Sequence, residues 1–203
     1  MRGENCWYDM LEASRAIRTG HFRLSSGQHS GMYIQCAKVL EDPARGEALG
    51  AALAREMQCD ADRVISPPLG GILIGYEVAR ALGKPFLFPE RGADGRLCLR
   101  RGFSLEPGER VCIVEDVVTT GKTTLELLDL LERSEVTTVS TGAIVDRSTT
   151  RTVKGMPIHA LLRLSIPTFD PEDCPHCGRG ETLQSPGSRH RQSVRPPSPV
   201  ASA

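Results

Sequence analysis

Hydrophobic and polar positions along the chain switch between helical and strand periods, which predicts alternating helices and strands. Leu49, Leu53 and Met57 repeat every four residues behind Asp42-Pro43, an N-cap followed by a proline suited to the first helical position, so we expect a helix over 43–57. The other expected elements are helices over 6–18, 71–82 and 121–133, a turn at 24–27 leading into a strand over 32–36, and strands over 63–66, 85–88, 110–114, 137–145 and 158–164.

The expected strands are apolar without alternation, as in Val111-Cys-Ile-Val114. Such strands are typical of a sheet covered by helices on both faces. The sequence therefore predicts an α/β fold with a mainly parallel central sheet flanked by helices. Ligands of such sheets bind beyond the carboxyl ends of the strands, so chemistry is expected in the loops after Ser66, Phe88, Val114 and Val145.

Composition narrows the function classes. The chain has 203 residues, with 25 Lys+Arg against 25 Asp+Glu, and this neutral balance argues against general nucleic-acid binding. The longest uncharged stretch, Val64–Tyr76, is interrupted by prolines and glycines and is too short to span a membrane. No basic-then-apolar leader opens the chain, so we expect a cytoplasmic protein with one domain over 1–181 and a disordered Pro/Ser/Arg-rich tail over 182–203.

The seven cysteines are odd in number, and we expect reduced thiols. Cys174-Pro-His-Cys177 alone has metal-like spacing, but a structural zinc site needs a second pair of ligands. We therefore expect a tight turn carrying two free thiols there. The alternative is a zinc ion shared across a dimer axis.

The segment Val111–Thr123 carries the clearest chemistry: an apolar strand, the acids Glu115 and Asp116, then a Thr/Gly loop opening a helix. Backbone N–H groups, hydroxyls and the positive helix end of that loop suit a phosphate monoester. The two carboxylates accept hydrogen bonds only and suit the hydroxyls of a ribose. A nucleotide-triphosphate P-loop is excluded because Asp116 stands where its first glycine belongs.

These thirteen residues resemble the signature of the type I phosphoribosyltransferases for phosphoribosyl pyrophosphate (PRPP), and Ile65-Ser-Pro-Pro-Leu-Gly-Gly71 resembles their pyrophosphate loop. The resemblance implies a type I phosphoribosyltransferase-like fold with a small N-terminal hood, built largely from residues 1–40. It also implies the PRPP-binding residues Pro68, Leu69, Gly70, Gly71, Glu115, Asp116, Val117, Val118, Thr119, Thr120, Gly121, Lys122 and Thr123.

Two further segments are similar to orotate phosphoribosyltransferases: His21–Cys36, like their hood, and Asp146-Arg147, like their Asp-Arg pair. A guanidinium fork fits a planar carboxylate, which orotate has and purines lack. The resemblance implies orotate contacts from Ser25, Tyr33, Thr119 and Arg147. It implies transfer of phosphoribosyl from PRPP to orotate, giving orotidine 5'-monophosphate in pyrimidine (UMP) biosynthesis.

The chain departs from this family at Ser25, where many members have a lysine, and at the loop 90–102, which is rich in arginine rather than Lys and His. Its arginines are Arg91, Arg96, Arg100 and Arg101; we expect catalytic roles for Arg91, Glu115 and Asp116. Arginines are poor proton donors. His29 is the alternative donor by residue type, although we expect it to be a solvated surface histidine.

The family resemblance also implies a homodimer whose loop acts in trans, and Mg²⁺ carried by PRPP with no direct protein ligand. The alternatives are a purine phosphoribosyltransferase and a regulatory protein that senses PRPP without turning it over. No membrane and no nucleic-acid partner is expected.

Overall fold

A computed structural model describes residues 2–24 and 26–186, with side chains from Cys6 onward. The chain divides into two compact units, which are described separately. The large unit comprises Met1–Arg18 and Ile34–Ser165, and the small unit comprises Thr19–Tyr33 and Ile166–Ala203. Most of the tail expected over 182–203 lies outside the described residues.

A six-stranded sheet in the order β4-β3-β7-β8-β10-β9 forms the centre of the large unit. All neighbouring strands are parallel except β9 and β10. This confirms the expected α/β fold with a mainly parallel sheet. The strands are β3 (Arg63–Ile65), β4 (Phe86–Leu87), β7 (Arg110–Val118), β8 (Thr137–Asp146), β9 (Thr152–Val153) and β10 (Met156–Arg163).

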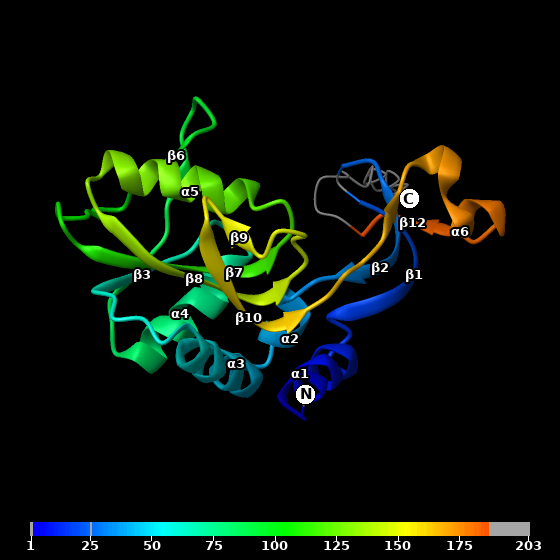
Figure 1. Cartoon of the computed structure of the whole chain (residues 1–203), viewed down its shortest axis with the longest axis horizontal. Helices are drawn as coiled ribbons and strands as arrows, with labels where there is room; N and C mark the ends of the chain where they lie inside the picture. The colour runs from blue at the N-terminus through cyan, green and yellow to red at the C-terminus, as the bar shows by residue number, and fades with distance from the viewer. Residues whose placement is uncertain (1, 25, 187–203) are drawn as a thin grey trace, which may run out of the picture. The chain divides into compact units, whose positions relative to one another are not determined.

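Helices cover both faces of this sheet (Figure 1): α3 (Pro43–Met57) and α4 (Gly71–Leu82) lie on one side and α5 (Lys122–Arg133) on the other. Helices α3 and α4 approach closely because Gly50 has no side chain; a Cβ there would lie 2.5 Å from Glu77 Cβ. Between α5 and the sheet, buried Leu127, Leu131 and Ile113 belong to one apolar core cluster. Burial of this apolar surface holds the sheet layers together.

Local sequence signals fix the two helices of the first face. The Asp42 side chain accepts a hydrogen bond from Ala44 N at 3.0 Å, and Pro43 opens α3 as expected. Helix α4 ends at Gly83, which adopts a left-handed conformation with φ of 64°. Among the described residues no helix is long and apolar enough to cross a membrane.

The expected helix over 6–18 is wrong at its end. Helix α1 (Arg2–Ala13) stops five residues earlier, Arg15 is left-handed with φ of 59°, and Ile17 starts strand β1 (Ile17–Arg23). Ile17 is buried, so its apolar side chain packs in the core from a strand and not from the face of a helix. A short apolar run fits either period, and only packing decides between them. The short helix α2 (Ala37–Leu40) was not predicted.

The small unit contains a four-stranded sheet in the order β11-β2-β1-β12, with β2 (His29–Ile34), β11 (Thr168–Phe169) and β12 (Leu183–Gln184). The hood expected from residues 1–40 thus takes only 19–33 from that range and adds C-terminal residues. Residues 183–184, expected in the tail, instead pair in parallel with β1. A 3₁₀ turn, Pro171–Asp173, and a short helix α6, Pro175–Gly178, precede β12.

Candidate functional site

The predicted phosphate, acid and arginine segments meet at one edge of the central sheet. Strands β3, β7 and β8 are parallel, so the loops that follow them leave the same edge. A Cβ on Gly70 would lie 2.6 Å from Asp116 Oδ2, which places the loop after β3 against the end of β7. Arg147 N donates a hydrogen bond to Val118 O at 2.8 Å, which joins the end of β8 to the same place. The structure therefore brings residues 68–71, 115–123 and 147 together.

Glu115 is almost fully buried on the face covered by α5. Its Oε1 accepts a hydrogen bond from Thr124 Oγ1 at 2.8 Å, and Thr124 is itself buried in the first turn of α5. Burial, together with a smaller effect of the nearby Asp116, raises the pKa of Glu115 to about 8, against the lowering effect of the Thr124 hydrogen bond. Glu115 is therefore mainly protonated at neutral pH in the ligand-free protein.

Asp116 has a different environment because successive strand residues point to opposite faces. Its carboxylate lies beside the Gly70 backbone, in a place that a side chain on residue 70 would fill. Burial raises its pKa as well, while backbone N–H groups of Val117 and of Asp116 itself favour the charged form. Strand β7 continues past the expected end at Val114 and ends at Val118. Both acids therefore lie within the strand.

The loop after β7 forms the N-terminal end of α5. Thr119 and Thr120 are exposed, and Lys122 N lies 3.4 Å from Thr120 Oγ1. Gly121 is left-handed with φ of 71°, a conformation that costs other residues energy, and Lys122 and Thr123 follow in the helix. The loop offers hydroxyls, first-turn N–H groups and the positive helix end at one point, a combination that attracts anions.

The pyrophosphate-type loop connects β3 to α4. Its Pro68–Leu69 peptide bond is cis, and Leu69 is 83% exposed. A Cβ on Gly71 would lie 3.0 Å from Val114 O, so the loop packs closely on β7. Ser66 Oγ is buried and has no partner among the described residues.

Arg147 directly follows β8, and its side chain can bind a ligand. Its Nε is buried without a hydrogen-bond partner in the described part of the chain, and burial lowers the pKa of its guanidinium. Asp146 holds the turn in place instead: its carboxylate accepts hydrogen bonds from Ser148 N at 2.8 Å and from Arg163 Nη1 at 2.6 Å. The two residues of the Asp-Arg pair thus differ: Asp146 is buried and stabilises the turn, whereas the Arg147 side chain has no partner among the described residues.

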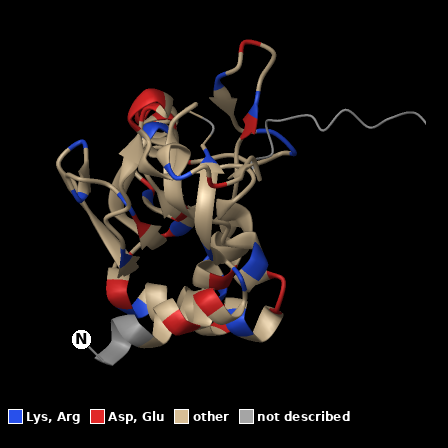
Figure 2. Cartoon of the chain, turned by 90° about the vertical axis from the view of Figure 1, so that its right-hand side faces the viewer, with Lys and Arg blue, Asp and Glu red and all other residues tan. Residues whose placement is uncertain are grey.

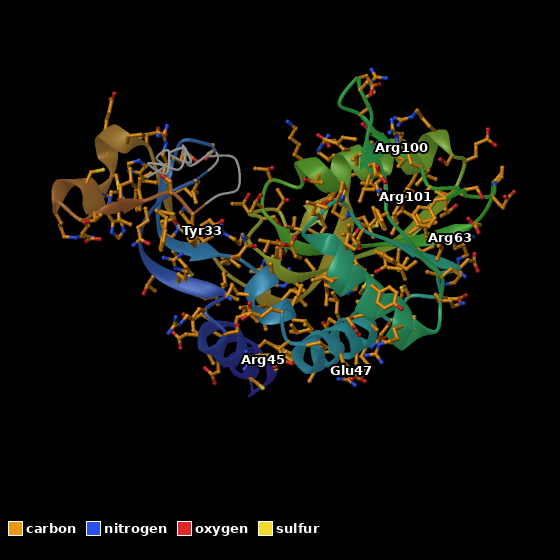
Figure 3. The ribbon with its side chains drawn as sticks, turned by 180° about the vertical axis from the view of Figure 1, so that it is seen from behind. Tyr33, Arg45, Glu47, Arg63, Arg100 and Arg101 are labelled. Atoms are coloured by element: carbon orange, nitrogen blue, oxygen red, sulfur yellow. The ribbon has the colours of Figure 1, made fainter. Side chains whose placement is uncertain are left out.

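The arginines of residues 90–102 differ in their partners. Arg91 pairs with Glu126 at 2.7 Å, and Arg101 pairs with Glu90. The side chains of Arg96 and Arg100 have no hydrogen-bond or ion-pair partner among the described residues, although Arg96 N donates to Asp94 Oδ1 at 3.1 Å. Arg100 and Arg101 follow the hairpin β5 (Glu90–Arg91) and β6 (Leu97–Cys98), which carries residues of both charges at the top of the view in Figure 2 (see also Figure 3).

The hood residues expected at the site belong to the small unit. Ser25 lies outside the described residues. Tyr33 packs beside Phe22, with ring centroids 5.7 Å apart. The expectation that His29 is solvated is wrong, because it is 5% exposed and its Nδ1 lies 3.0 Å from His21 Nε2. No spacing in the sequence predicts this pairing.

Comparison with known proteins decides the family. Residues 39–168 match the phosphoribosyl transferase domain. The chain belongs to the phosphoribosyltransferase family. It is 44% identical to the orotate phosphoribosyltransferase of Thermotoga maritima over 89% of this chain and 97% of that protein.

Solved phosphoribosyltransferases share its fold. The orotate phosphoribosyltransferase of Aeropyrum pernix superposes with a TM-score of 0.64 and 27% identity, covering 77% of this chain and 92% of that one. The adenine phosphoribosyltransferase of Thermoanaerobacter pseudethanolicus gives 0.57 and 21%, covering 66% and 88%. The fold is therefore common to phosphoribosyltransferases with different acceptor bases and does not by itself choose the acceptor.

Proposed function

We propose that this phosphoribosyltransferase transfers the phosphoribosyl group of PRPP to orotate, giving orotidine 5'-monophosphate and pyrophosphate in pyrimidine biosynthesis. The observation that carries the proposal is the unpaired guanidinium of Arg147 at the strand ends, beside the phosphate-type loop. Arg147 is half-buried, and its buried Nε without a partner costs free energy that a hydrogen bond to a planar carboxylate would recover. Among the acceptors considered, orotate carries that carboxylate and purines do not.

The loop from Thr119 to Thr123 is the proposed site of the 5-phosphate. Its exposed hydroxyls and the first N–H groups of α5 provide donors, and Gly121 supplies the left-handed backbone conformation that the loop needs. The pyrophosphate is assigned to Pro68–Gly71, which the two glycines allow to pack closely against Val114 and Asp116 of β7. Mg²⁺ carried by PRPP would neutralise part of the pyrophosphate charge; the carboxylates and hydroxyls at this edge of the sheet are oxygen groups that would suit its bound waters.

Asp116 and Glu115 are proposed to hold the ribose hydroxyls. Asp116 acts as a charged acceptor that also stabilises the positive charge developing on the ribose in the transition state. In the reaction, the orotate ring nitrogen forms a bond to the anomeric carbon while the bond from that carbon to pyrophosphate breaks, and the proton of the ring nitrogen passes to the departing pyrophosphate or to water. The protein mainly aligns the reactants and balances charge, so no covalent enzyme intermediate is required.

The loop arginines are the proposed partners of the leaving pyrophosphate, supplied across a homodimer. Arg91 would first have to leave Glu126, whereas Arg100 is free of such a pair among the described residues. Arg96 and Arg100, which have no such pair among the described residues, are therefore proposed for this role beside Arg91. The homodimer, the loop acting in trans and the cytoplasmic location stay predictions.

The test follows the loss of the orotate ultraviolet band in a mixture of protein, Mg²⁺, PRPP and orotate. We expect turnover with orotate and none with adenine or hypoxanthine assayed in parallel. Asp116→Asn should lower kcat roughly 100- to 1,000-fold, as for other removed electrostatic partners in active sites, with an unchanged circular dichroism spectrum. A purine acceptor used faster than orotate would refute the assignment, and an undiminished rate in Asp116→Asn would remove that residue from the mechanism.

A further inference from the structure

Four metal-ligating side chains converge in the small unit, away from every residue assigned to PRPP in the sequence. His21 lies in β1 and His29 at the start of β2. Cys174 directly precedes α6, and Cys177 lies within α6. One potential ligand atom from each residue lies within 4.8 Å of all the others. His21, His29 and Cys174 are buried, and Cys177 is exposed.

The separations between the ligand atoms fit a tetrahedral zinc site. His21 Nε2 lies 3.0 Å from His29 Nδ1, 3.5 Å from Cys174 Sγ and 3.6 Å from Cys177 Sγ, and Cys177 Sγ lies 3.3 Å from His29 Nδ1. Typical zinc bond lengths place two nitrogens of one tetrahedron about 3.3 Å apart and a nitrogen and a sulfur about 3.6 Å apart. The observed spacing therefore leaves room for one ion at the centre.

A hydrogen bond outside the cluster orients His21. Its Nδ1 lies 2.9 Å from Glu181 O, and a carbonyl oxygen can only accept, so Nδ1 carries the proton and Nε2 presents its lone pair to the cluster. Histidine ligands of metals are commonly fixed in this way. His176, between the two cysteines, is not part of the cluster: it bonds Glu181 Oε2 at 2.7 Å and stacks on His21 with ring centroids 5.4 Å apart.

The small unit has little else to hold it together. Among its described residues, Phe22 and Cys174 are the buried apolar ones, and the other buried side chains are His21, His29 and Ser30. So little apolar burial stabilises a unit of this size only weakly. Two thiolates and two neutral imidazoles around a divalent ion give zero net charge, which suits a buried position.

We propose that His21, His29, Cys174 and Cys177 bind one structural Zn²⁺ that ties β1 and β2 to the C-terminal segment. Four protein ligands complete a tetrahedral shell and leave no position open for substrate, as in structural zinc sites. The sequence expectation of two free thiols changes accordingly: the missing ligand pair comes from the N-terminal strands of the same chain, not from across a dimer axis. Histidines this far from the Cys-Pro-His-Cys motif gave no spacing signal.

The metal content of the full chain tests the proposal. After dialysis against Zn²⁺ and removal of unbound metal, elemental analysis should find about one zinc per chain, and Cys177→Ser and His29→Ala should lose most of it. Cys98→Ser, a half-buried cysteine of the large unit, and His176→Gln, the neighbouring histidine, are matched controls that should keep it. Protein loaded with Co²⁺ should show sulfur-to-cobalt charge-transfer bands that Cys177→Ser weakens.

Measurements on the unmodified chain test the proposal even if the variants fail to fold. Zn²⁺ should shield Cys174 and Cys177 from alkylation, as read by peptide mass spectrometry, and a chelator should both expose them and lower the melting temperature. The proposal is overturned if the dialysed chain holds no metal, if Cys177→Ser binds as much zinc as the original, or if Cys174 and Cys177 are recovered as a disulfide. Orotate turnover is not part of this readout, so the proposed function can fail independently.

Discussion

Replacing Glu115 with glutamine should remove a large pH dependence of stability in the ligand-free protein. The Glu115 carboxyl is buried on the α5 side of the sheet, where Thr124 Oγ1 donates to it at 2.8 Å. Burial raises its pKa to about 8 from an ordinary 4.5. Glutamine has nearly the same shape, keeps a carbonyl oxygen for the Thr124 hydroxyl and cannot ionise.

The sign and size of this pH dependence of stability follow from the different pKa values of Glu115 in the folded and unfolded states. As pH rises above 4.5 the unfolded chain loses the Glu115 proton while the folded protein keeps it until about pH 8, so ionisation favours the unfolded state over that window. At about 1.36 kcal/mol per pH unit, the cost grows by about 4 kcal/mol between pH 5 and 8.5. Stability from this group is thus present below pH 4.5 and lost as pH rises through 8.

Urea unfolding at pH 5, 6, 7 and 8.5, at constant zinc and without substrates, measures the effect. The difference in unfolding free energy between Glu115→Gln and the original protein should grow steadily with pH in favour of the variant. Glu56→Gln, an exposed acid on α3, should show a flat difference. A flat difference for Glu115→Gln as well would mean that Glu115 is ionised in the folded protein, and the argument from burial would be refuted.

Three further substitutions test the rest of the site. Gly70→Ala places a Cβ 2.6 Å from Asp116 Oδ2 and should raise the KM for PRPP in steady-state assays; an unchanged KM would dissociate this contact from PRPP binding. Arg147→Lys loses the guanidinium fork, so the KM for orotate should rise roughly 10- to 100-fold, the equivalent of a charged hydrogen bond of about 1.5–3 kcal/mol, with little change in the KM for PRPP. Gly121→Ala has to adopt a φ of 71° with its Cβ 3.0 Å from Val153, and urea unfolding should show a loss of about 1–2 kcal/mol, whereas equal stability would mean that the loop relaxes.

The loop arginines illustrate how packing modifies a sequence-based role. Arg91 was expected to act in catalysis, yet it lies on Glu126 of α5, which is far from it in sequence. Which of Arg91, Arg96 and Arg100 can turn to a ligand depends on which acids the fold places beside each one. No local pattern contains that information.

Local signals in the sequence determined most of the large unit. The Asp42 cap, the repeat of Leu49, Leu53 and Met57, and Gly83 set the ends of α3 and α4, because caps and helical periodicity act over a few residues. The sequence also predicted the acid pair and the Thr/Gly loop, because a phosphate site at the start of a helix is built from consecutive residues. These are interactions within one short segment of chain.

Tertiary structure alone decided the features that join distant segments. It ended α1 at Ala13 and gave Glu115 and Asp116 different surroundings, through contacts with Thr124 and Gly70. It also brought Cys177 to His29 across 148 residues. The environment of a side chain depends on whatever the folded chain packs against it, and neither spacing nor composition records which partners arrive from far along the sequence.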